Sequence, residues 1–390
     1  MATRPRVADQ DAAIAHYVRR DRERGLPPDR PPLLRMALFR RSDDRVHCVL
    51  THHHLLLDGW SQQLLLAELL AAYDRLGDGG AAATETGPAP SVPPAPRAYL
   101  DWLANQSLDA ARRFWQERLH GFVPRPPAGV GTVCPPGRYR TLEHLVPAPT
   151  AAALDAYARR HRLTIGTLVQ AGWALLLARA SGSTDVAFGL TLSGRPAELP
   201  GATEALGLFI NTLPARVAVA DHESLPDWLG RIQQDGRALD RYGYTPLPVV
   251  EQCRTDGGTE PLFRSLVVIE NFPTTVDDGY RSRRLRVERV HGTIEEGYPL
   301  VVEARPGPSR PLRLRLRYNQ AAVPDPVAAE LHNGLVDCLD LLAADPPGTV
   351  GELAGRIAAR QAGRATAEQA GRMRAARRQP ITAAGGERDG

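Results

Sequence analysis

The 390-residue sequence contains no lysine, so all 48 of its cationic side chains other than histidine are arginines. The missing amine excludes a catalytic Schiff base on a lysine. The chain has only four cysteines, which lie far apart and lack the spacing of a zinc or redox motif, at Cys48, Cys134, Cys253 and Cys338. We therefore expect a reducing compartment, the cytoplasm, for this protein.

Long apolar runs are also missing. No stretch is long enough to span a bilayer, and the N-terminus lacks the apolar core of a signal peptide. We therefore expect no membrane association. The formal net charge is +4, but residues 354–390 hold eight arginines against Glu368, Glu387 and Asp389, a surplus of five positive charges. The rest of the chain thus carries about one negative charge, which argues against nucleic-acid binding.

The stretch Thr51–Ser61, THHHLLLDGWS, combines the residues that carry chemistry. Before it, apolar residues alternate over Val46–Leu50, which predicts a strand. After it, a leucine-rich run over 64–76 predicts a helix, and Ser61 is placed to cap its N-terminus. The sequence therefore predicts that histidines stand where a strand ends and a turn leads into a helix, a position where function concentrates.

A neutral imidazole near pH 7 can accept a proton from a nucleophile and later return it. His53 and His54 are expected to point to opposite sides, because neighbouring side chains at a strand end do so. His54 continues the alternation of the strand, which favours an inward position for it. Asp58 is placed to orient an imidazole or to hold the turn through an arginine. Gly59 permits a backbone conformation that a side chain would obstruct.

Two other interpretations of this stretch remain open from the residues alone. A pair of adjacent histidines is often a structural or surface feature. A His/His/Asp set also contains ligand types that bind zinc. No second cluster of such ligands stands out elsewhere in the sequence to complete a metal site.

Helical and strand patterns alternate along both halves of the chain, which favours layers of α/β type. The length predicts two or three units with their own cores. The proline-rich connection 123–136 suggests a boundary, with one lobe over residues 1–122 and a second over 123–353. The arginine-rich tail, residues 354–390, has few large apolar residues and is expected to be flexible or weakly helical.

The segment His53–Gly59 resembles the HHxxxDG signature of nonribosomal peptide synthetase condensation domains, which related acyltransferases of the chloramphenicol acetyltransferase type share. Trp60 and Ser61 after the glycine are typical of the condensation branch. Further motifs resemble those of the same family and follow in its order, so that the resemblance extends from about residue 9 to about 353. They are DVAFG with SGRP over 185–196, GLFINTLP over 207–214 and PLF with VVIENFP over 261–273.

This resemblance implies a fold of two chloramphenicol-acetyltransferase-like α/β sandwich lobes in a V, with the histidine loop at their junction. It implies condensation activity, in which an acceptor amine attacks a donor thioester and forms a peptide bond. The partners would be donor and acceptor peptidyl carrier proteins, and possibly other synthetase modules. Phosphopantetheine would be carried by those partners, and this chain would bind no metal or cofactor of its own.

The resemblance also implies roles for particular residues. His54 would act on the attacking amine, while His53 and Gly59 shape the loop. Asp58 would pair with Arg195 and join the two lobes. The candidates for the substrate tunnel, each of which also has a purely structural interpretation, are Trp115, Ser193, Asn211 and Asn271.

One departure from the family pattern concerns the start of the domain. The family's opening helix and its Arg-His-x-x-Leu-Arg motif do not precede the histidine motif, because Met1 lies only 53 residues before His54. We expect a first lobe that lacks this opening segment and is the less stable of the two. Two alternative functions follow, a stand-alone acyltransferase using a free thioester or an alcohol acceptor, and a catalytically silent carrier-binding module.

Overall fold

The computed structural model describes residues 7–77, 96–271, 282–292, 294, 297–306, 311–345 and 348–378. The chain forms two compact units. The first consists of Met1–Gln106, Ser193–Ile210 and Phe272–Gly292, and the second of Ser107–Leu192, Asn211–Asn271 and Thr293–Gly390. This division differs from the predicted single boundary at residue 122, because two later segments belong to the first unit. The arrangement of two lobes in a V stays a prediction.

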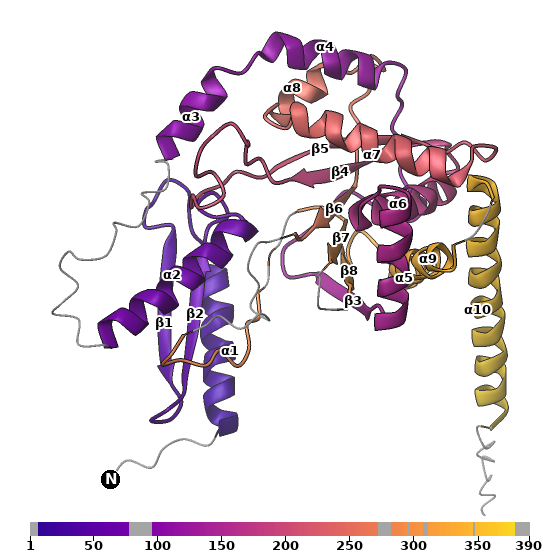
Figure 1. Ribbon diagram of the computed structural model, residues 1–390. Helices are drawn as coiled ribbons and strands as arrows, with labels where there is room; N and C mark the ends of the chain where they lie inside the picture. Colours follow the sequence, from indigo (N-terminus) through magenta and orange to yellow (C-terminus); the bar gives the residue numbers. More distant parts are fainter. Residues whose placement is uncertain are drawn as a thin grey trace, which may run out of the picture. The chain divides into compact units, whose positions relative to one another are not determined.

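A six-stranded mixed sheet forms the centre of the second unit (Figure 1). The parallel pairs are β4 with β6 and β6 with β7, and the other neighbours are antiparallel. Helices and strands alternate along the chain around this sheet, and this confirms the predicted α/β class. In spatial order the strands are β3 (Tyr139–Leu145), β8 (Arg313–Asn319), β7 (Leu300–Arg305), β6 (Ser265–Ile269), β4 (Asp185–Leu192) and β5 (Asn211–Ala218).

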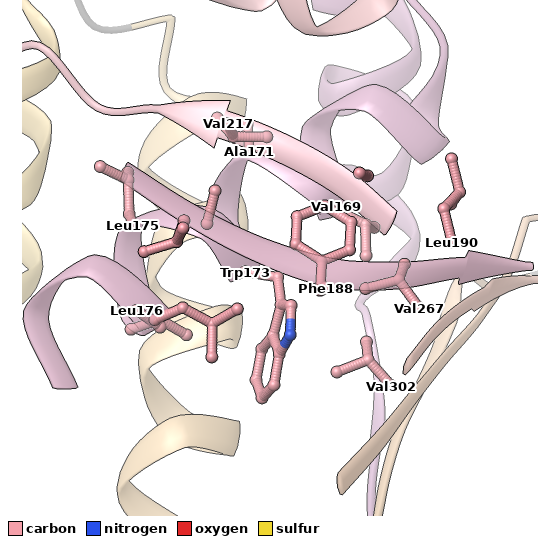
Figure 2. Packing of buried hydrophobic residues seen from close by; sticks show 14 of the residues in the cluster. Val169, Ala171, Trp173, Leu175, Leu176, Phe188, Leu190, Val217, Val267 and Val302 are labelled. Carbon is pink, nitrogen blue, oxygen red and sulfur yellow. The ribbon is translucent and has the colours of Figure 1, made fainter. Parts of the chain in front are cut away.

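Helix α6 (Ile165–Ser181) is the central helix of this unit, with eleven buried residues. Thr164 caps its N-terminus by accepting from the Thr167 N–H, and Gly182 ends it in the left-handed conformation. Trp173 on this helix is fully buried against the sheet, and its indole N–H donates to the Ser265 hydroxyl over 3.0 Å (Figure 2). The other helices of the unit are α4 (Leu108–Leu119), α5 (Ala148–Arg160), α7 (Leu225–Arg241), α8 (Leu247–Gln252), α9 (Asp325–Ala343) and α10 (Val350–Arg378).

The C-terminal part of the chain is more regular than its composition suggests. Helix α10 packs along α9, where Arg364 forms an ion pair with the buried carboxylate of Asp337. The first part of the predicted flexible tail, residues 354–378, thus belongs to a helix. Residues 379–390 lie outside the described residues. Packing of one apolar stripe, with Leu353 and Ile357 buried, outweighs the weak propensity of the sequence.

The first unit is built on an antiparallel hairpin of β1 (Leu34–Arg40) and β2 (Val46–His52), in which Leu34 pairs with His52. Helix α1 (Val7–Arg24) covers one face, since Tyr17 packs edge-on against Phe39 and Asp21 binds Arg35 over 2.8 Å. Helices α2 (Gly59–Gly77) and α3 (Pro96–Ala104) complete its regular structure in the described residues.

The other face of this hairpin is exposed. Met36, Leu38 and Val46 keep 45%, 65% and 62% of their surface accessible. In the described part of the first unit only four large apolar side chains are buried, Ile14, Leu57, Leu70 and Phe209. Such a small core contributes little hydrophobic stabilisation compared with that of the second unit.

No single helix in the described ranges has the length and apolar composition of a membrane span. One bent pair, α5 with α6, meets that test by length and composition alone, with a bend of 99°. Most of α6 is buried in the protein core.

We predict that the first unit opens before the second. Few buried apolar contacts hold the β1–β2 hairpin, so its amides should exchange with deuterium at least about tenfold faster than those of β6 and β7. Hydrogen exchange of the whole chain, followed by mass spectrometry, measures both regions in one sample. Equal protection of the two sheets would show that the first unit gains stability from a source other than its own core.

Candidate active site

The histidine segment is a tight turn fixed by its backbone. Strand β2 ends at His52, and residues 54–56 form the turn that follows. The His53 N–H donates to the Leu33 carbonyl over 2.9 Å, and the His53 carbonyl accepts from the Leu56 N–H over 3.0 Å. The predicted alternation that placed His54 inward is therefore wrong, because the strand stops two residues earlier and period two does not extend into a turn.

The three histidines of this segment have different hydrogen bonds. The Nδ1–H of His52 donates to the His53 carbonyl over 3.3 Å, and burial lowers the pKa of His52. Nδ1 of His53 accepts from the Leu55 N–H over 3.1 Å, which holds the turn. The ring of His54 is half-buried and forms no hydrogen bond with any residue that the structure describes. Of the three rings, that of His54 is the one in which neither nitrogen is bonded to a described residue.

Asp58 directly precedes helix α2, and its side chain is completely buried. Its Oδ1 accepts from the Ser61 N–H over 2.7 Å, and its carbonyl accepts from the Gln62 N–H over 2.9 Å. Asp58 is therefore the N-terminal cap, and the prediction that Ser61 is the cap is wrong. Its carboxylate satisfies the N–H of the third helical residue, which has no partner within the helix, and interacts favourably with the helix dipole.

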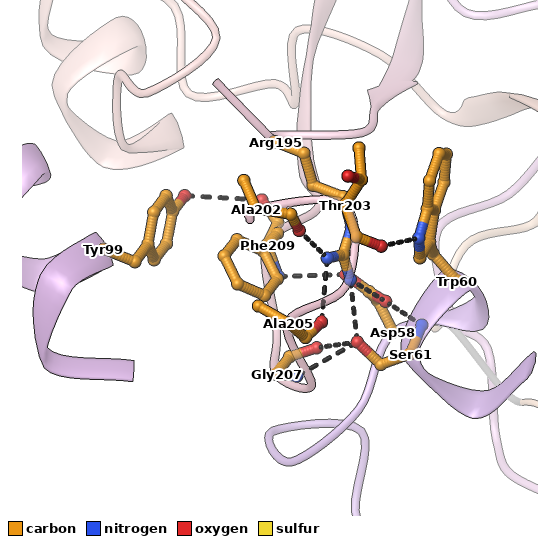
Figure 3. Close-up of polar contacts among 10 residues, drawn as sticks. All are labelled: Asp58, Trp60, Ser61, Tyr99, Arg195, Ala202, Thr203, Ala205, Gly207 and Phe209. Atoms are coloured by element: carbon orange, nitrogen blue, oxygen red, sulfur yellow. Dashed lines mark hydrogen bonds and ion pairs between the residues drawn. The ribbon is translucent and has the colours of Figure 1, made fainter. Parts of the chain in front are cut away.

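Asp58 and Arg195 form the predicted ion pair (Figure 3). Nη2 of Arg195 lies 3.2 and 3.4 Å from the two carboxylate oxygens, and only 3% of the arginine side chain and none of the aspartate side chain is exposed. Both residues belong to the first unit, so their predicted role in joining two lobes stays a prediction. Burial lowers the pKa of Arg195, and the charge of Asp58 opposes that shift.

The other terminal nitrogen of the guanidinium is also occupied, while the buried Nε has no hydrogen-bond partner among the described residues. Nη1 donates to the carbonyls of Ala202 and Ala205. The guanidinium carbon Cζ lies 4.2 Å from the centre of the Phe209 ring and 5.2 Å from the centre of the Trp60 ring. Only arginine supplies several directed donors and a flat cation for stacking, so lysine would be a poor replacement.

Glycine is required at Gly194, while the predicted need for glycine at position 59 stays a prediction. Gly59 is the first residue of α2 and is not in the left-handed conformation. Gly194, next to the arginine, has a φ of 60°, and a Cβ there would lie 1.7 Å from the Phe209 carbonyl oxygen. No side chain fits this space, so Gly194 fixes how closely the two ends of segment 194–209 approach.

The four tunnel candidates lie in different environments. Trp115 is fully buried in the core of the second unit, so it has no surface for a substrate, and the packing interpretation accounts for it. The amide of Asn211 donates to the Gly243 and Thr245 carbonyls, both over 2.7 Å, which is the structural alternative. Ser193 and Asn271 are exposed, and their tunnel roles stay predictions.

Several residues that bind around Asp58 and Arg195 were not predicted for this site. The Phe209 N–H donates to Asp58 over 3.0 Å, the Trp60 indole donates to the Thr203 carbonyl over 2.9 Å, and Ser61 contacts Gly207. The Tyr99 hydroxyl lies 3.5 Å from the Phe209 carbonyl, and burial raises its pKa. Trp60 and Ser61 directly follow Gly59, and Gly207 and Phe209 lie in the motif over 207–214. Thr203 and Tyr99 had no such signal in the sequence.

A zinc site is not supported by this geometry. Both oxygens of Asp58 are occupied by N–H donors, and Nδ1 of His53 holds the turn. Within the described ranges no group of three His, Cys, Asp or Glu side chains is arranged to hold a metal ion.

Comparison with known proteins identifies the family. The family model for the condensation domain matches residues 3–355, nearly the whole chain. The chain belongs to the condensation domain family. A linear gramicidin synthase of Brevibacillus parabrevis is 35% identical over 356 residues, and chondramide synthase cmdD of Chondromyces crocatus is 38% identical over 298. These relatives are nonribosomal peptide synthetases.

The matching region is a small part of such relatives. The matches cover 89% and 75% of this chain, but only 7% of each of the two synthetases. Among solved structures, the first condensation domain of the calcium-dependent antibiotic synthetase aligns with a TM-score of 0.66 at 24% identity, covering 88% of this chain and 77% of that one. This likeness shows that the two chains share the condensation-domain fold, which is of the chloramphenicol acetyltransferase type.

We predict that Asp58 and Arg195 stabilise the protein as one unit. Removing either partner leaves a buried charge without its counterion, which should cost roughly 3–5 kcal/mol of unfolding free energy. A cycle of Asp58→Ala, Arg195→Ala and the double variant, measured by denaturant unfolding, should give a double loss well below the sum of the single losses. Arg195→Lys should recover little of the loss. Additive single losses would reject the coupling.

Proposed function

We propose that this domain forms an amide bond between acyl or aminoacyl groups presented as thioesters by two carrier proteins in nonribosomal peptide synthesis. The observation that carries the proposal is the unbonded ring of His54 at the centre of a turn that is held at both ends. Membership of the condensation domain family supports the same reaction. The multidomain relatives support carrier proteins as the source of both substrates.

In this reaction the acceptor amine nitrogen attacks the carbonyl carbon of the donor thioester. A C–N bond forms, the C–S bond breaks, and the electron pair of that bond leaves with sulfur. The amine loses one proton, which the neutral imidazole of His54 accepts and then delivers to the departing thiolate. His54 also hydrogen-bonds the attacking nitrogen, and this positioning contributes because a neutral amine is already a good nucleophile.

The neighbouring residues support His54 without taking part in the bond changes. His53 uses Nδ1 to hold the Leu55 amide, and Asp58 uses both carboxylate oxygens within the protein. The Nδ1 lone pair of His53 and both carboxylate oxygens of Asp58 are therefore engaged within the protein. We propose that phosphopantetheine is part of the carrier substrates and that this chain contributes side chains alone.

The two alternative functions differ in the substrates that they accept. A stand-alone acyltransferase would turn over a free acyl thioester or an alcohol acceptor at a rate close to that with carriers. A silent carrier-binding module would bind loaded carriers and form no amide. Incubation of the purified chain with two loaded carriers, and in parallel with free thioesters, separates these cases when products are measured by mass spectrometry.

We predict that His54→Ala lowers the single-turnover rate of amide formation by about a hundredfold or more, because it removes the proton acceptor. Its melting temperature should stay near that of the parent protein, since the His54 ring forms no hydrogen bond with the described residues. The matched control is His53→Asn, which removes an imidazole but leaves an oxygen to accept from the Leu55 N–H. It should retain most of the activity. A His54→Ala variant with a near-normal rate would refute the assignment.

A further inference from the structure

We propose that Ser61 is a positioning residue for His54, acting through Gly207 and Asp58. This inference rests on the proposed function of His54. The serine lies on the first turn of α2, one turn beyond the histidine segment, and its side chain cannot reach a substrate because the residue is completely buried. Its position is set by the helix, while its hydroxyl binds a segment more than 130 residues away in sequence.

All of the hydrogen-bonding capacity of this hydroxyl is used (Figure 3). It accepts from Nη2 of Arg195 over 2.8 Å and from the Gly207 N–H over 3.0 Å, and it donates to the Gly207 carbonyl over 2.8 Å. One donor and two acceptor sites is the full capacity of a serine. Removing the oxygen would leave the Gly207 N–H without its hydrogen-bond partner. The Gly207 carbonyl and Nη2 of Arg195 would each lose one bond and keep their bonds to Asp58.

The Gly207 carbonyl connects this serine to the histidine segment. The same oxygen that accepts from Ser61 also accepts from the Asp58 N–H over 3.1 Å. That bond fixes the C-terminal end of the turn, as the bond between the His53 N–H and Leu33 fixes the N-terminal end. A displaced Gly207 would therefore release one of the two anchors between which His54 lies.

The residue before Ser61 holds the same segment at a second point. The Trp60 indole donates to the Thr203 carbonyl over 2.9 Å, and its ring lies against the guanidinium of Arg195. Two consecutive helix residues thus bind Thr203 and Gly207 separately. The first turn of α2 therefore aligns segment 194–209 with the turn that carries His54.

A structural role and a positioning role predict different results, and the chain offers a matched control. Ser265 is also buried, at 2% exposure, and its hydroxyl accepts from Trp173 in the core of the second unit. Ser265→Ala and Ser61→Ala each remove one buried hydroxyl. Both variants should have a lower melting temperature, but only Ser61→Ala should disturb the turn that carries His54.

The experiment compares the full chain with Ser61→Ala, Ser265→Ala and Trp60→Phe. Hydrogen exchange at the Asp58 amide and the NMR titration of the His54 ring report on the turn without any substrate. We expect Ser61→Ala to raise exchange at Asp58 about tenfold or more and to shift the His54 titration. Its single-turnover rate with loaded carriers should fall by about tenfold to a hundredfold, with half-saturation changed less than about threefold. Ser265→Ala should leave the Asp58 exchange rate, the His54 titration and the single-turnover rate unchanged.

Trp60→Phe removes one hydrogen bond and keeps a ring, so it should fold and show a smaller change of the same kind. If Ser61→Ala does not fold, the exchange at Asp58 and the His54 titration are measured on Trp60→Phe. Unchanged exchange at Asp58 and an unchanged His54 titration in the folded variants would overturn the proposal. These two readouts need no turnover, so a failure of the proposed function, seen as an active His54→Ala, is distinguishable from a failure of this coupling.

Discussion

The geometry of this site depends on the buried ion pair between Asp58 and Arg195. Removing two charges from water is costly, and the hydrogen bonds and ring contacts around the pair offset part of that cost. The carboxylate caps a helix and accepts the Phe209 N–H, and the guanidinium binds two carbonyls between two aromatic rings. The pair therefore organises the backbone around it at least as much as it stabilises the fold.

The histidine turn shows the result of that organisation. Its ends are held by backbone bonds to Leu33 and Gly207, and the neighbouring rings of His52 and His53 bind backbone groups. His54 lies between these anchors with both nitrogens unbonded to the described residues. A fixed backbone with one unsatisfied imidazole suits a group that must meet a substrate in a defined direction, because little reorganisation is then needed.

Periodic patterns in the sequence predicted the regular elements well. The alternation over Val46–Leu50 became β2, and the leucine-rich run over 64–76 became α2, because each period matches its element. The ion pair was also predicted, since the motifs that contain its two partners resemble a known family. The buried state of Trp115 agrees with the packing interpretation.

The errors concern features that no local pattern encodes. Asp58 and Ser61 are both good capping residues, and the position where the helix begins decides between them. Which glycine is indispensable depends on the distance between Gly194 and Phe209, which lie fifteen residues apart in sequence. The two compact units divide the chain differently from the boundary predicted at residue 122, because a proline-rich connection marks a loop and does not show to which unit later segments return.

The discontinuous first unit has a consequence for building hybrid synthetases. An exchange of residues 1–106 between two relatives would bring in a new Asp58, Trp60 and Ser61 but keep the old Arg195 and Gly207. The recombined site would then combine residues from two different relatives that did not evolve together. A crossover that respects the structure must transfer Ser193–Ile210 and Phe272–Gly292 together with the N-terminal portion, three pieces of chain in place of one.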